Sequence, residues 1–239
     1  YSQAGTPEVS VEDDYDENNQ TYSATFTQKN QKTPYMIPNQ FGLIDKDGEE
    51  IESGLIIIDE LVKTISFNNI KSKPIPSWFR GFSSPIKFSS DLSIQNKLYL
   101  ASSDTDPFNR WDSAQSLWLE YVLNPDQVIE KDLFQMIKNL FNNESDYSLL
   151  SEMISLPSEQ IIHQNVGKIN VQEVHNQRNQ SILSIASTFK DELLELYDQL
   201  NAPKAFDLST QSIGERALKN KCLSYLSKLG EYDIAYQQF

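Results

Sequence analysis

The chain has 239 residues, of which 38% are hydrophobic and 11% aromatic, the composition of a globular protein with one large domain or two smaller ones. It carries 34 acidic against 20 basic residues, and the resulting formal charge of −14 repels nucleic-acid phosphates and anionic membranes. Its apolar runs, such as Leu55–Ile58, are far shorter than the ~20 residues of a membrane span. We therefore expect no nucleic-acid partner and no membrane partner.

The single cysteine, Cys222, excludes an internal disulfide framework and favours a reducing compartment, so we expect a cytoplasmic protein. The chain begins YSQAGTPEVS, without an initiator methionine and without the basic and apolar regions of a signal peptide. Its last residues, DIAYQQF, form no polar tail. Together the two ends predict a fragment of a longer protein.

The first part of the chain shows the period of two that is typical of β-strands. In TYSATFTQ, Tyr22, Ala24 and Phe26 alternate with threonine and serine, and VKTISF alternates in the same way. LIDKDGEEI has two short runs around a central Asp-Gly pair, which predicts a hairpin. Short strands separated by turns at this spacing predict a small β-sandwich.

After about Asp91 the hydrophobic residues step by three or four, as on one face of a helix. Ser212 followed by Glu215 forms a capping-box pattern, which predicts the start of the last long helix. Prolines divide this region and predict antiparallel helices of about 12 to 20 residues. The stepping residues are Ile182, Ile185, Phe189, Leu193, Leu196 and Leu200, then Leu218, Cys222, Tyr225 and Leu229, and the prolines are Pro107, Pro125, Pro157 and Pro203.

The change of period predicts two separate parts. The expected fold class is α+β in two segregated parts, a small Ig-like antiparallel β-sandwich followed by an α-helical array that begins an α-superhelix. The expected domains are residues 1–90 for the β-sandwich and residues 91–239 for the α-helical domain. We expect the helical domain to be the N-terminal part of a longer array.

Histidine and cysteine form no recognisable catalytic or metal-binding pattern. Zinc hydrolases place two histidines one helical turn apart with a glutamate between them, whereas His163 and His175 are twelve residues apart. We interpret His175 as a helix-packing residue, because it lies seven residues before Ile182. Cys222 lies on an apolar stripe, which predicts a small buried hydrophobe rather than a thiolate.

Serines, glycines and carboxylates also form no recognisable catalytic or ligand-binding pattern. RGFSSP at 80–85 lacks the G-x-S-x-G elbow, and the eight glycines form no phosphate loop. EDDYDENN has five acids between Glu12 and Glu17 but not the spacing of a calcium loop, and neither has DKDGEE at 45–50. We interpret EDDYDENN as a solvated turn between strands. Spacing alone does not exclude a pair of carboxylates that act as general acid and base, but it singles out no such pair. We therefore expect no catalytic, cofactor-binding or metal-binding residues in this chain.

One stretch, DPFNRWDSAQSL at 106–117, gathers several reactive residue types. Asp106 suits the N-cap position and Pro107 the first helical position. Arg110 and Asp112 lie off the apolar face, toward solvent or a neighbouring domain. The stretch therefore predicts a capped amphipathic helix rather than part of an active site. The residues that step along its apolar face are Phe108, Trp111, Ala114, Trp118 and Tyr121.

Four ordered blocks, this stretch among them, resemble the bacterial aminopeptidase N family, which are zinc metallopeptidases of the gluzincin type. The blocks are YSQAGTPEVSVEDDY at 1–15, PIPSWFRGFSSPIKF at 74–88, DPFNRWDSAQSL at 106–117 and ERALKNKCLSYL at 215–226. The resemblance covers essentially the whole chain and is weaker at 29–60 and 124–180. It implies the family's small β-sandwich domain and the start of its C-terminal helical domain, placed just after a thermolysin-like catalytic domain.

The family's H-E-x-x-H zinc motif, its downstream glutamate ligand, its G-x-M-E-N motif and its catalytic tyrosine have no counterpart in this sequence. The resemblance therefore implies no cofactor in this chain and zinc in the catalytic domain upstream. It implies a non-catalytic fragment of an aminopeptidase that removes N-terminal amino acids from peptides, with this part acting as a scaffold and a lid that restricts substrate access. The implied partners are the upstream catalytic domain and, in the intact enzyme, peptide substrates.

Two other hypotheses stay open, a free-standing protein-interaction module and an enzyme with an unfamiliar site. The fragment hypothesis predicts a zinc motif encoded just upstream of Tyr1, and a chain that alone is not an enzyme. The module hypothesis predicts native expression at this length. We also expect weak self-association, because a fragment exposes surface that was once an interdomain interface.

Overall fold

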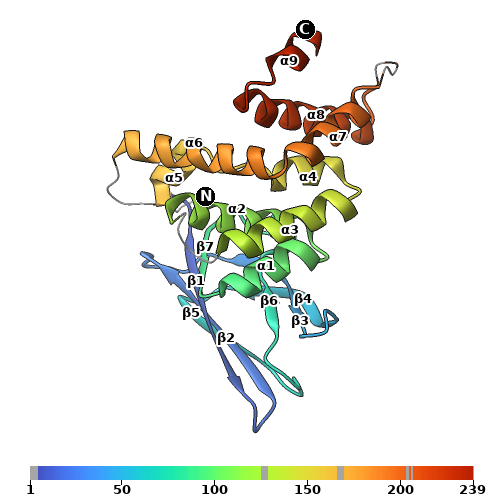
Figure 1. Ribbon diagram of the computed structural model, residues 1–239. Helices are drawn as coiled ribbons and strands as arrows, with labels where there is room; N and C mark the ends of the chain where they lie inside the picture. Colours follow the sequence, from blue (N-terminus) through green and yellow to red (C-terminus); the bar gives the residue numbers. More distant parts are fainter. Residues whose placement is uncertain (1–4, 125–128, 166–169, 203–204, 206, 239) are drawn as a thin grey trace. The chain divides into compact units, whose positions relative to one another are not determined.

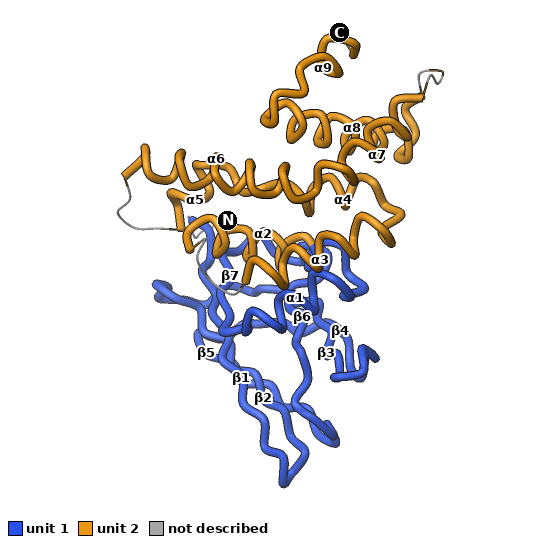
Figure 2. Tube along the Cα trace, viewed as in Figure 1, with its two compact units in different colours: residues 1–110 blue, residues 111–239 orange. Residues whose placement is uncertain are grey.

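The computed structural model describes residues 5–124, 129–165, 170–202, 205 and 207–238. The chain forms two compact units, residues 1–110 and 111–239 (Figure 2). The first unit contains the strands and the first helix, and the second contains the later helices (Figure 1). The division between the units falls inside helix α2 (Pro107–Leu123).

The first unit is a β-sandwich in which seven strands of the described residues form two sheets (Figure 1). The larger sheet has the order β5-β2-β1-β7, and the smaller sheet has the order β4-β3-β6. Neighbouring strands are antiparallel as predicted, except that β1 and β7 run parallel. A parallel pair needs a long crossover, and the chain makes the other strands before β7 returns to β1. The strands are β1 (Glu8–Asp16), β2 (Thr21–Lys29), β3 (Ile37–Ile44), β4 (Glu50–Ile58), β5 (Val62–Phe67), β6 (Ile75–Ser77) and β7 (Lys87–Ser90).

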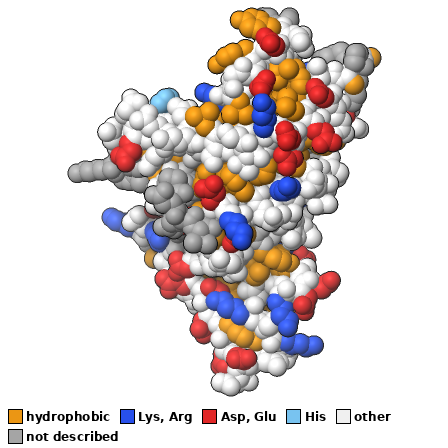
Figure 3. Space-filling view, viewed as in Figure 1, with side chains coloured by type: hydrophobic (Ala, Val, Ile, Leu, Met, Phe, Trp, Pro, Cys, Tyr) orange, Lys and Arg blue, Asp and Glu red, His pale blue; other side chains and the backbone are white. Residues whose placement is uncertain are grey.

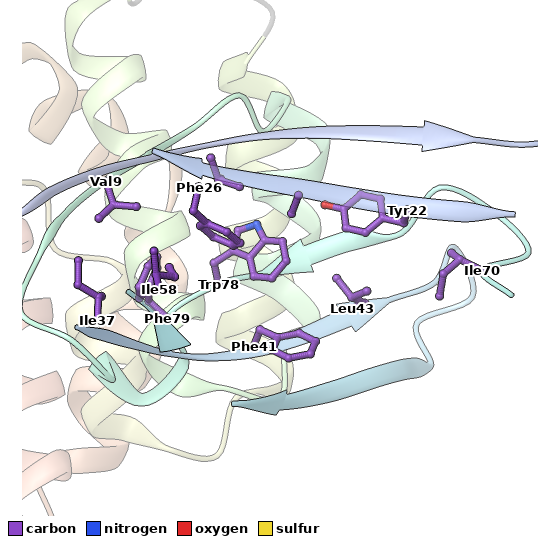
Figure 4. Close-up of a cluster of buried hydrophobic side chains, with 12 residues drawn as sticks. Val9, Tyr22, Phe26, Ile37, Phe41, Leu43, Ile58, Ile70, Trp78 and Phe79 are labelled. Atoms are coloured by element: carbon purple, nitrogen blue, oxygen red, sulfur yellow. The ribbon is translucent and has the colours of Figure 1, made fainter. Parts of the chain in front are cut away.

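The core of the first unit lies between the two sheets, where side chains from both inner faces meet (Figure 4). Tyr22, Ala24 and Phe26 of β2 are fully buried, as their alternation predicted. Phe26 meets Trp78 edge to face, with ring centroids 5.0 Å apart. Each large side chain buried here contributes about 1.5–3 kcal/mol to stability. The other face of β2 is polar, since hydroxyl pairs 2.9 Å apart join it to β5.

The hairpin predicted at the Asp-Gly pair joins β3 to β4. Asp45 Oδ1 accepts hydrogen bonds from the amides of Asp47 at 2.8 Å and Glu49 at 2.9 Å. Gly48 has φ +92°, a conformation that residues with a Cβ rarely adopt. The sequence therefore identified both the place of this turn and the residue that permits it.

The acidic segment EDDYDENN is mostly strand, so its interpretation as a turn was only partly right. Residues 8–16 pair with β2 along their whole length, and only residues 17–20 form the turn. Asp13 makes an ion pair of 3.1 Å with Lys73. Asp16 accepts hydrogen bonds from Asn19, which lower the pKa of this carboxyl. The acids therefore line the end of a strand and fix its turn.

The described residues after the strands form nine α-helices, of which α1 belongs to the first unit. In the second unit α8 packs against α4, α6, α7 and α9 and so lies at the centre of the array. No helix in the described ranges has both the length and the apolarity needed to cross a membrane. The helices after α2 are α3 (Ile129–Asn143), α4 (Tyr147–Met153), α5 (Glu159–Asn165), α6 (Val171–Thr188), α7 (Lys190–Leu200), α8 (Thr210–Lys228) and α9 (Tyr232–Gln238), and α1 is Ile94–Ser103.

The apolar stripe predicted over residues 182–200 runs across two helices. Helices α6 and α7 meet at Phe189, whose φ of −108° and ψ of +24° interrupt the helical conformation. Ile185, Phe189 and Leu193 are buried as the stripe predicted. The pattern thus identified the buried residues but not the break between the helices.

The capping box predicted at Ser212 is wrong. Helix α8 begins at Thr210, and its N-cap is Ser209, whose Oγ accepts a hydrogen bond of 3.2 Å from the Ser212 amide. Asp207 fixes the turn before the helix by accepting a bond of 3.0 Å from the Ser209 amide. Because several polar residues precede this helix, the sequence offered more than one suitable cap.

The predicted role of the prolines is confirmed in part. Pro107 is the first residue of α2, and Pro157 lies between α4 and α5. Pro125 and Pro203 lie outside the described residues. Five helices of the described residues are shorter than predicted, since α4, α5 and α9 have seven residues each, α1 has ten and α7 has eleven. Helices also end where no proline follows, which the proline pattern did not take into account.

Candidate functional site

Two of the sequence blocks that resemble aminopeptidase N meet in a buried polar network inside the first unit. Ser77 and Arg80 come from the block at 74–88, where Arg80 begins the short 3-10 turn η1 (Arg80–Phe82). Asn109 comes from the block that begins α2, and Asp104 is the C-cap of α1. The side chains of Arg80 and Asp104 are 8% and 0% exposed. The network thus joins segments that are distant in the sequence.

Asp104 has hydrogen-bond partners on both carboxylate oxygens. Oδ1 accepts from Arg80 Nη2 at 3.0 Å and from the Asp106 amide at 3.0 Å, and Oδ2 accepts from the Ser77 hydroxyl. A buried carboxylate is tolerated only when it is ion-paired and hydrogen-bonded. These partners satisfy that condition, so Asp104 has a structural role.

Arg80 lies against strand β3 and extends the network to its surface. Its Nε donates to Ser77 Oγ at 2.9 Å, and its Nη1 donates to the Glu50 carboxylate. The Arg80 guanidinium, together with the Ser53 hydroxyl, holds the pKa of Glu50 below its usual value. A Cβ on Gly42 would lie 2.1 Å from Arg80 Cζ, so this glycine leaves the space that the guanidinium fills.

Asp106 caps α2, as the sequence predicted. Its Oδ1 accepts from the Asn109 amide at 2.9 Å, and its Oδ2 accepts from the Gly81 amide at 2.9 Å. Asn109 Nδ2 in turn donates to Ser77 Oγ at 2.6 Å and to the Trp78 carbonyl at 2.9 Å. The start of the helix is therefore held to η1 and β6 by side chains from both sequence blocks.

The buried face of α2 is wider than the predicted stripe. Trp118 and Tyr121 are buried as predicted, whereas Phe108 and Trp111 are only half-buried. Leu117, which lay outside the stripe, is fully buried. A helix that packs against several neighbours buries more of its circumference than steps of three and four mark out.

The two charged residues predicted to lie off this face differ in their surroundings. Arg110 is half-buried, and its Nε donates a hydrogen bond of 3.3 Å to the Ala101 carbonyl at the end of α1. Asp112 is exposed. Asp112 is therefore open to solvent, whereas Arg110 is partly covered.

In the second unit three side chains donate hydrogen bonds to the carbonyls of the last residue of α4 and of the two residues after it. The last carbonyls of a helix have no partner within the helix, so buried ones need a donor from elsewhere. Burial raises the pKa of the Tyr225 phenol, which keeps it protonated and able to donate. The bonds run from Trp118 Nε1 to Met153 O at 2.7 Å, from Tyr225 Oη to Ile154 O at 2.5 Å and from Gln115 Nε2 to Ser155 O at 2.8 Å.

Cys222 is fully buried in α8, which confirms its prediction as a small buried hydrophobe. Burial raises the pKa of the thiol to about 12. At neutral pH the side chain is therefore a neutral thiol rather than a nucleophilic thiolate.

The serines of RGFSSP also bond to the backbone. Ser83 Oγ accepts from the Gln40 amide at 3.1 Å, and Ser84 Oγ donates to the Pro38 carbonyl at 2.5 Å. Both bonds attach the segment after η1 to strand β3. Neither of these two bonds involves a side chain that could act as a general base, so the serines have a structural role and hold the loop against β3.

His175 lies at the surface of α6, so its interpretation as a packing residue was wrong. Its Nδ1 lies 2.8 Å from Glu159 Oε1, and its Nε2 lies 2.8 Å from Asn179 Nδ2. The neighbouring Val174 is the buried residue at this point of the helix. His175 therefore links α5 to α6 through polar contacts.

The described ranges contain no cluster of three or more histidine, cysteine, aspartate or glutamate side chains that suits a metal ion. His163 and His175 belong to different helices, α5 and α6. Zinc prefers three or four such ligands around one point. The residues described here therefore do not fit a zinc site.

Two hollows of the described surface are lined by a mixture of polar and apolar residues. One hollow of about 420 Å³ lies between the starts of α4 and α8, where Asp146 already caps α4. A second lies beside β4 in the first unit. On the face drawn in Figure 3, acidic side chains are scattered rather than gathered into one patch.

Comparison with known families gives the class of the protein. Residues 5–91 match a family model described as a domain of unknown function with an Ig-like fold, DUF3458. Residues 94–239 match the companion model DUF3458_C, described as a domain of unknown function with ARM repeats. The chain belongs to this DUF3458 family. The expected fold class, an Ig-like sandwich followed by a helical array, is confirmed.

The relatives are aminopeptidases. Aminopeptidase N of Escherichia coli (strain K12) is 28% identical over 98% of this chain and 30% of its own length. Aminopeptidase N of Caulobacter vibrioides is 29% identical over 95% of this chain and 28% of its own length. A crystal structure of Legionella pneumophila aminopeptidase A in complex with aspartic acid superposes with a TM-score of 0.84 at 28% identity, over 95% of this chain and 28% of that one. The chain thus corresponds to the C-terminal part of aminopeptidase N, as the four blocks predicted, and spans less than a third of these relatives.

Proposed function

We propose that the chain is a non-catalytic part of a zinc-dependent aminopeptidase and serves as scaffold and lid for a catalytic domain elsewhere in the protein. The observation that carries this proposal is the likeness over 95–98% of the chain to less than a third of aminopeptidase N. The whole enzyme would remove N-terminal amino acids from peptides. Its partners for this chain are the upstream catalytic domain and the peptide substrate.

The scaffold role is supported by the buried network. Arg80 of the block at 74–88 forms a buried ion pair with Asp104, and Asn109 of the block at 106–117 donates a hydrogen bond to Ser77 of the first block. Zinc in the catalytic domain would supply the Lewis acid and the activated water. The residues of this chain would hold the sandwich and the first helices in place around that domain.

The lid role is supported by the class of the helical part. ARM repeats stack into arrays with extended surfaces, which suit the covering of a peptide channel. A lid of this kind would limit the size of substrates that reach the zinc. The single buried Cys222 is compatible with the reducing conditions of the cytoplasm, which we propose as the location.

Deleting this region from the full-length protein tests the lid role. We expect the truncated enzyme to keep its zinc and to cleave short aminoacyl anilides, while losing its preference for short peptides over long ones. The zinc content of the truncated enzyme shows whether the catalytic domain has folded. An unchanged size preference in a zinc-loaded truncated enzyme would contradict the lid role.

The second candidate is a free-standing protein-interaction module, which the long exposed edge of β4 favours. Its test is the size of the native protein in the source cells, detected with an antibody to this region. A band at the mass of this chain would support the module. A band about three times as large, with aminopeptidase activity, would support the enzyme, because the relatives are more than three times as long as their matched part.

A further inference from the structure

The outer edge of β4 is a long strand edge without a neighbour in the described part of the first unit. β4 ends the smaller sheet and pairs only with β3 there. Six consecutive residues, 50–55, are exposed, which includes the backbone at Gly54. The pairing shifts once near the start of β4 and is regular from Glu52 to Ile58. The edge thus offers a row of backbone donors and acceptors to another chain.

The other sheet edges carry the usual protection against such pairing. β6 has three residues and β7 has four, which is too short to template a neighbour. β5 carries Lys63, which makes an ion pair of 2.6 Å with Asp59. β4 has nine residues and contains no lysine, arginine or proline. β4 carries charge only at Glu50 and Glu52, next to the shift in pairing, so its residues 53–58 form the longest uncharged stretch among these four edges.

The outer face of β4 is apolar near its middle. Ile56 and Ile58 point toward the core, so Leu55 and Ile57 lie on the opposite face. Leu55 is 64% exposed. A strand added beside β4 would place every second side chain next to Leu55 and Ile57, so apolar residues at those positions would bury this surface.

The start of β4 is strongly acidic. Residues 45–52 contain five acids and one base, and only Glu50 has an ion-pair partner within the described ranges. A hollow of about 380 Å³ opens beside this end of the strand. Its carboxylates come from Asp45 and Glu52. The hollow is lined by Asp45, Ile51, Glu52, Asn68, Asn69, Ile70, Lys71 and Ser72.

We propose that β4 binds an extended, basic segment of a partner protein by strand addition. The segment pairs its backbone with the free edge, sets apolar side chains beside Leu55 and Ile57, and directs lysine or arginine toward Glu52 and the hollow. A second copy of this chain is a poor occupant, because it would bring the same acids and a net charge of −14. The site does not depend on the aminopeptidase proposal, and it deepens the second candidate function, whose supporting observation is the same β4 edge.

The probe is a synthetic peptide, acetyl-Thr-Lys-Val-Lys-Val-Lys-Val-Thr-amide, with a control peptide in which glutamate replaces each lysine. Binding is measured by titration, and hydrogen exchange locates it. We expect the lysine peptide to slow exchange of the β4 amides between Glu52 and Ile58. The glutamate peptide is expected to bind at least about tenfold more weakly, because its charges oppose those of the acidic turn.

Variants of the chain test the two parts of the site. Leu55→Ser and Glu52→Gln are each expected to weaken binding of the lysine peptide about three- to fivefold, in line with cross-strand pair energies. Val62→Thr on the edge of β5 is the matched control, since Val62 is also exposed and is expected to leave binding unchanged. Circular dichroism confirms that each variant is folded.

Three outcomes would overturn the proposal. One is the absence of any protection of β4 amides at saturating lysine peptide. Another is equal binding of the two peptides, which would remove the basis for a basic partner. The third is a dimer that Leu55→Ser abolishes, seen by sedimentation without any peptide binding, which would make a second copy the occupant. The proposal would be supported if the lysine peptide slowed hydrogen exchange only at β4 amides and if Leu55→Ser and Glu52→Gln each reduced this effect.

Discussion

Different kinds of contact stabilise the interior of each unit. The sandwich depends on contacts between residues far apart in the chain, and it contains a buried ion pair between Arg80 and Asp104. The helical unit depends on helices that form locally, and its buried polar contacts run from side chains such as Tyr225 to backbone carbonyls. Removal of a single charged residue should therefore destabilise the sandwich more than the helical unit, whose buried polar contacts are made by neutral groups.

The largest expected effect is the loss of Arg80. Arg80→Met removes the cation from the buried Asp104 carboxylate, and we expect the sandwich to lose about 3–5 kcal/mol of stability. Calorimetry of the whole chain should show a lower transition for the first unit and an unchanged one for the second. If the free energy of unfolding of the first unit changed by less than about 1 kcal/mol, the network would not be a major source of its stability.

A surface ion pair provides the matched control for this variant. Lys63 and Asp59 lie 2.6 Å apart at partly exposed positions. Lys63→Met is expected to change stability by less than about 1 kcal/mol, because exposed pairs gain little. Equal effects of the two methionine variants would remove the distinction between buried and exposed charge.

The next effect is expected at Gly42. Gly42→Ala places a Cβ 2.1 Å from Arg80 Cζ, which forces the guanidinium away from Asp104 and should cost about 1–3 kcal/mol. Gly54→Ala is the control, since its Cβ would meet the Phe41 ring at an ordinary 3.5 Å. In an Arg80→Met background the cost of Gly42→Ala should largely disappear, and an unchanged cost would mean that the two residues are not coupled.

A smaller effect is expected in the helical unit. Tyr225→Phe removes the bond to the Ile154 carbonyl and should destabilise this unit by about 1 kcal/mol. Tyr232, which is 60% exposed, is the control, and Tyr232→Phe should have no measurable effect. Denaturant titrations followed by circular dichroism compare the two. If Tyr225→Phe lowered the stability of the first unit alone, the bond to Ile154 would not stabilise the helical unit as proposed.

The smallest effect concerns Cys222. Because burial raises the pKa of the thiol to about 12, the folded chain keeps a proton that the unfolded chain releases near the ordinary thiol pKa. The stability that this group contributes is therefore complete below the ordinary pKa and falls as pH rises toward 12. At neutral pH the thiol should react with a disulfide reagent only when the second unit opens. Rapid labelling of the native chain would contradict its burial.

The sequence predicted the strands of the sandwich well, because a half-buried strand shows its period directly. Tyr22, Ala24 and Phe26 alternate in the sequence and are buried in the structure. It predicted the helical residues but not the break at Phe189, since a stripe that continues across two helices looks like one helix. The wrong cap at Ser212 has a similar cause, because Ser209 competes for the same role.

The buried network was not predicted, because its members come from distant parts of the sequence. Arg80 and Asp104 are 24 residues apart and belong to different elements. We considered RGFSSP as a serine motif and as part of the block at 74–88, but neither use assigned a partner to Arg80, and Asp104 was not considered. A glycine in a strand, Gly42, was the one hint that something approaches the backbone closely. His175 was placed on the wrong face because its reference residue, Ile182, is itself only half-buried, whereas Val174 and Ser181 mark the buried face of α6.

The most direct test of the account is the chemistry of the isolated chain. The purified chain is analysed for zinc and assayed with aminoacyl anilides, beside the full-length protein as a positive control. The account predicts no stoichiometric zinc and no hydrolysis by the chain, and both in the full-length protein. Equimolar zinc in the isolated chain, with turnover that a chelator abolishes, would contradict it.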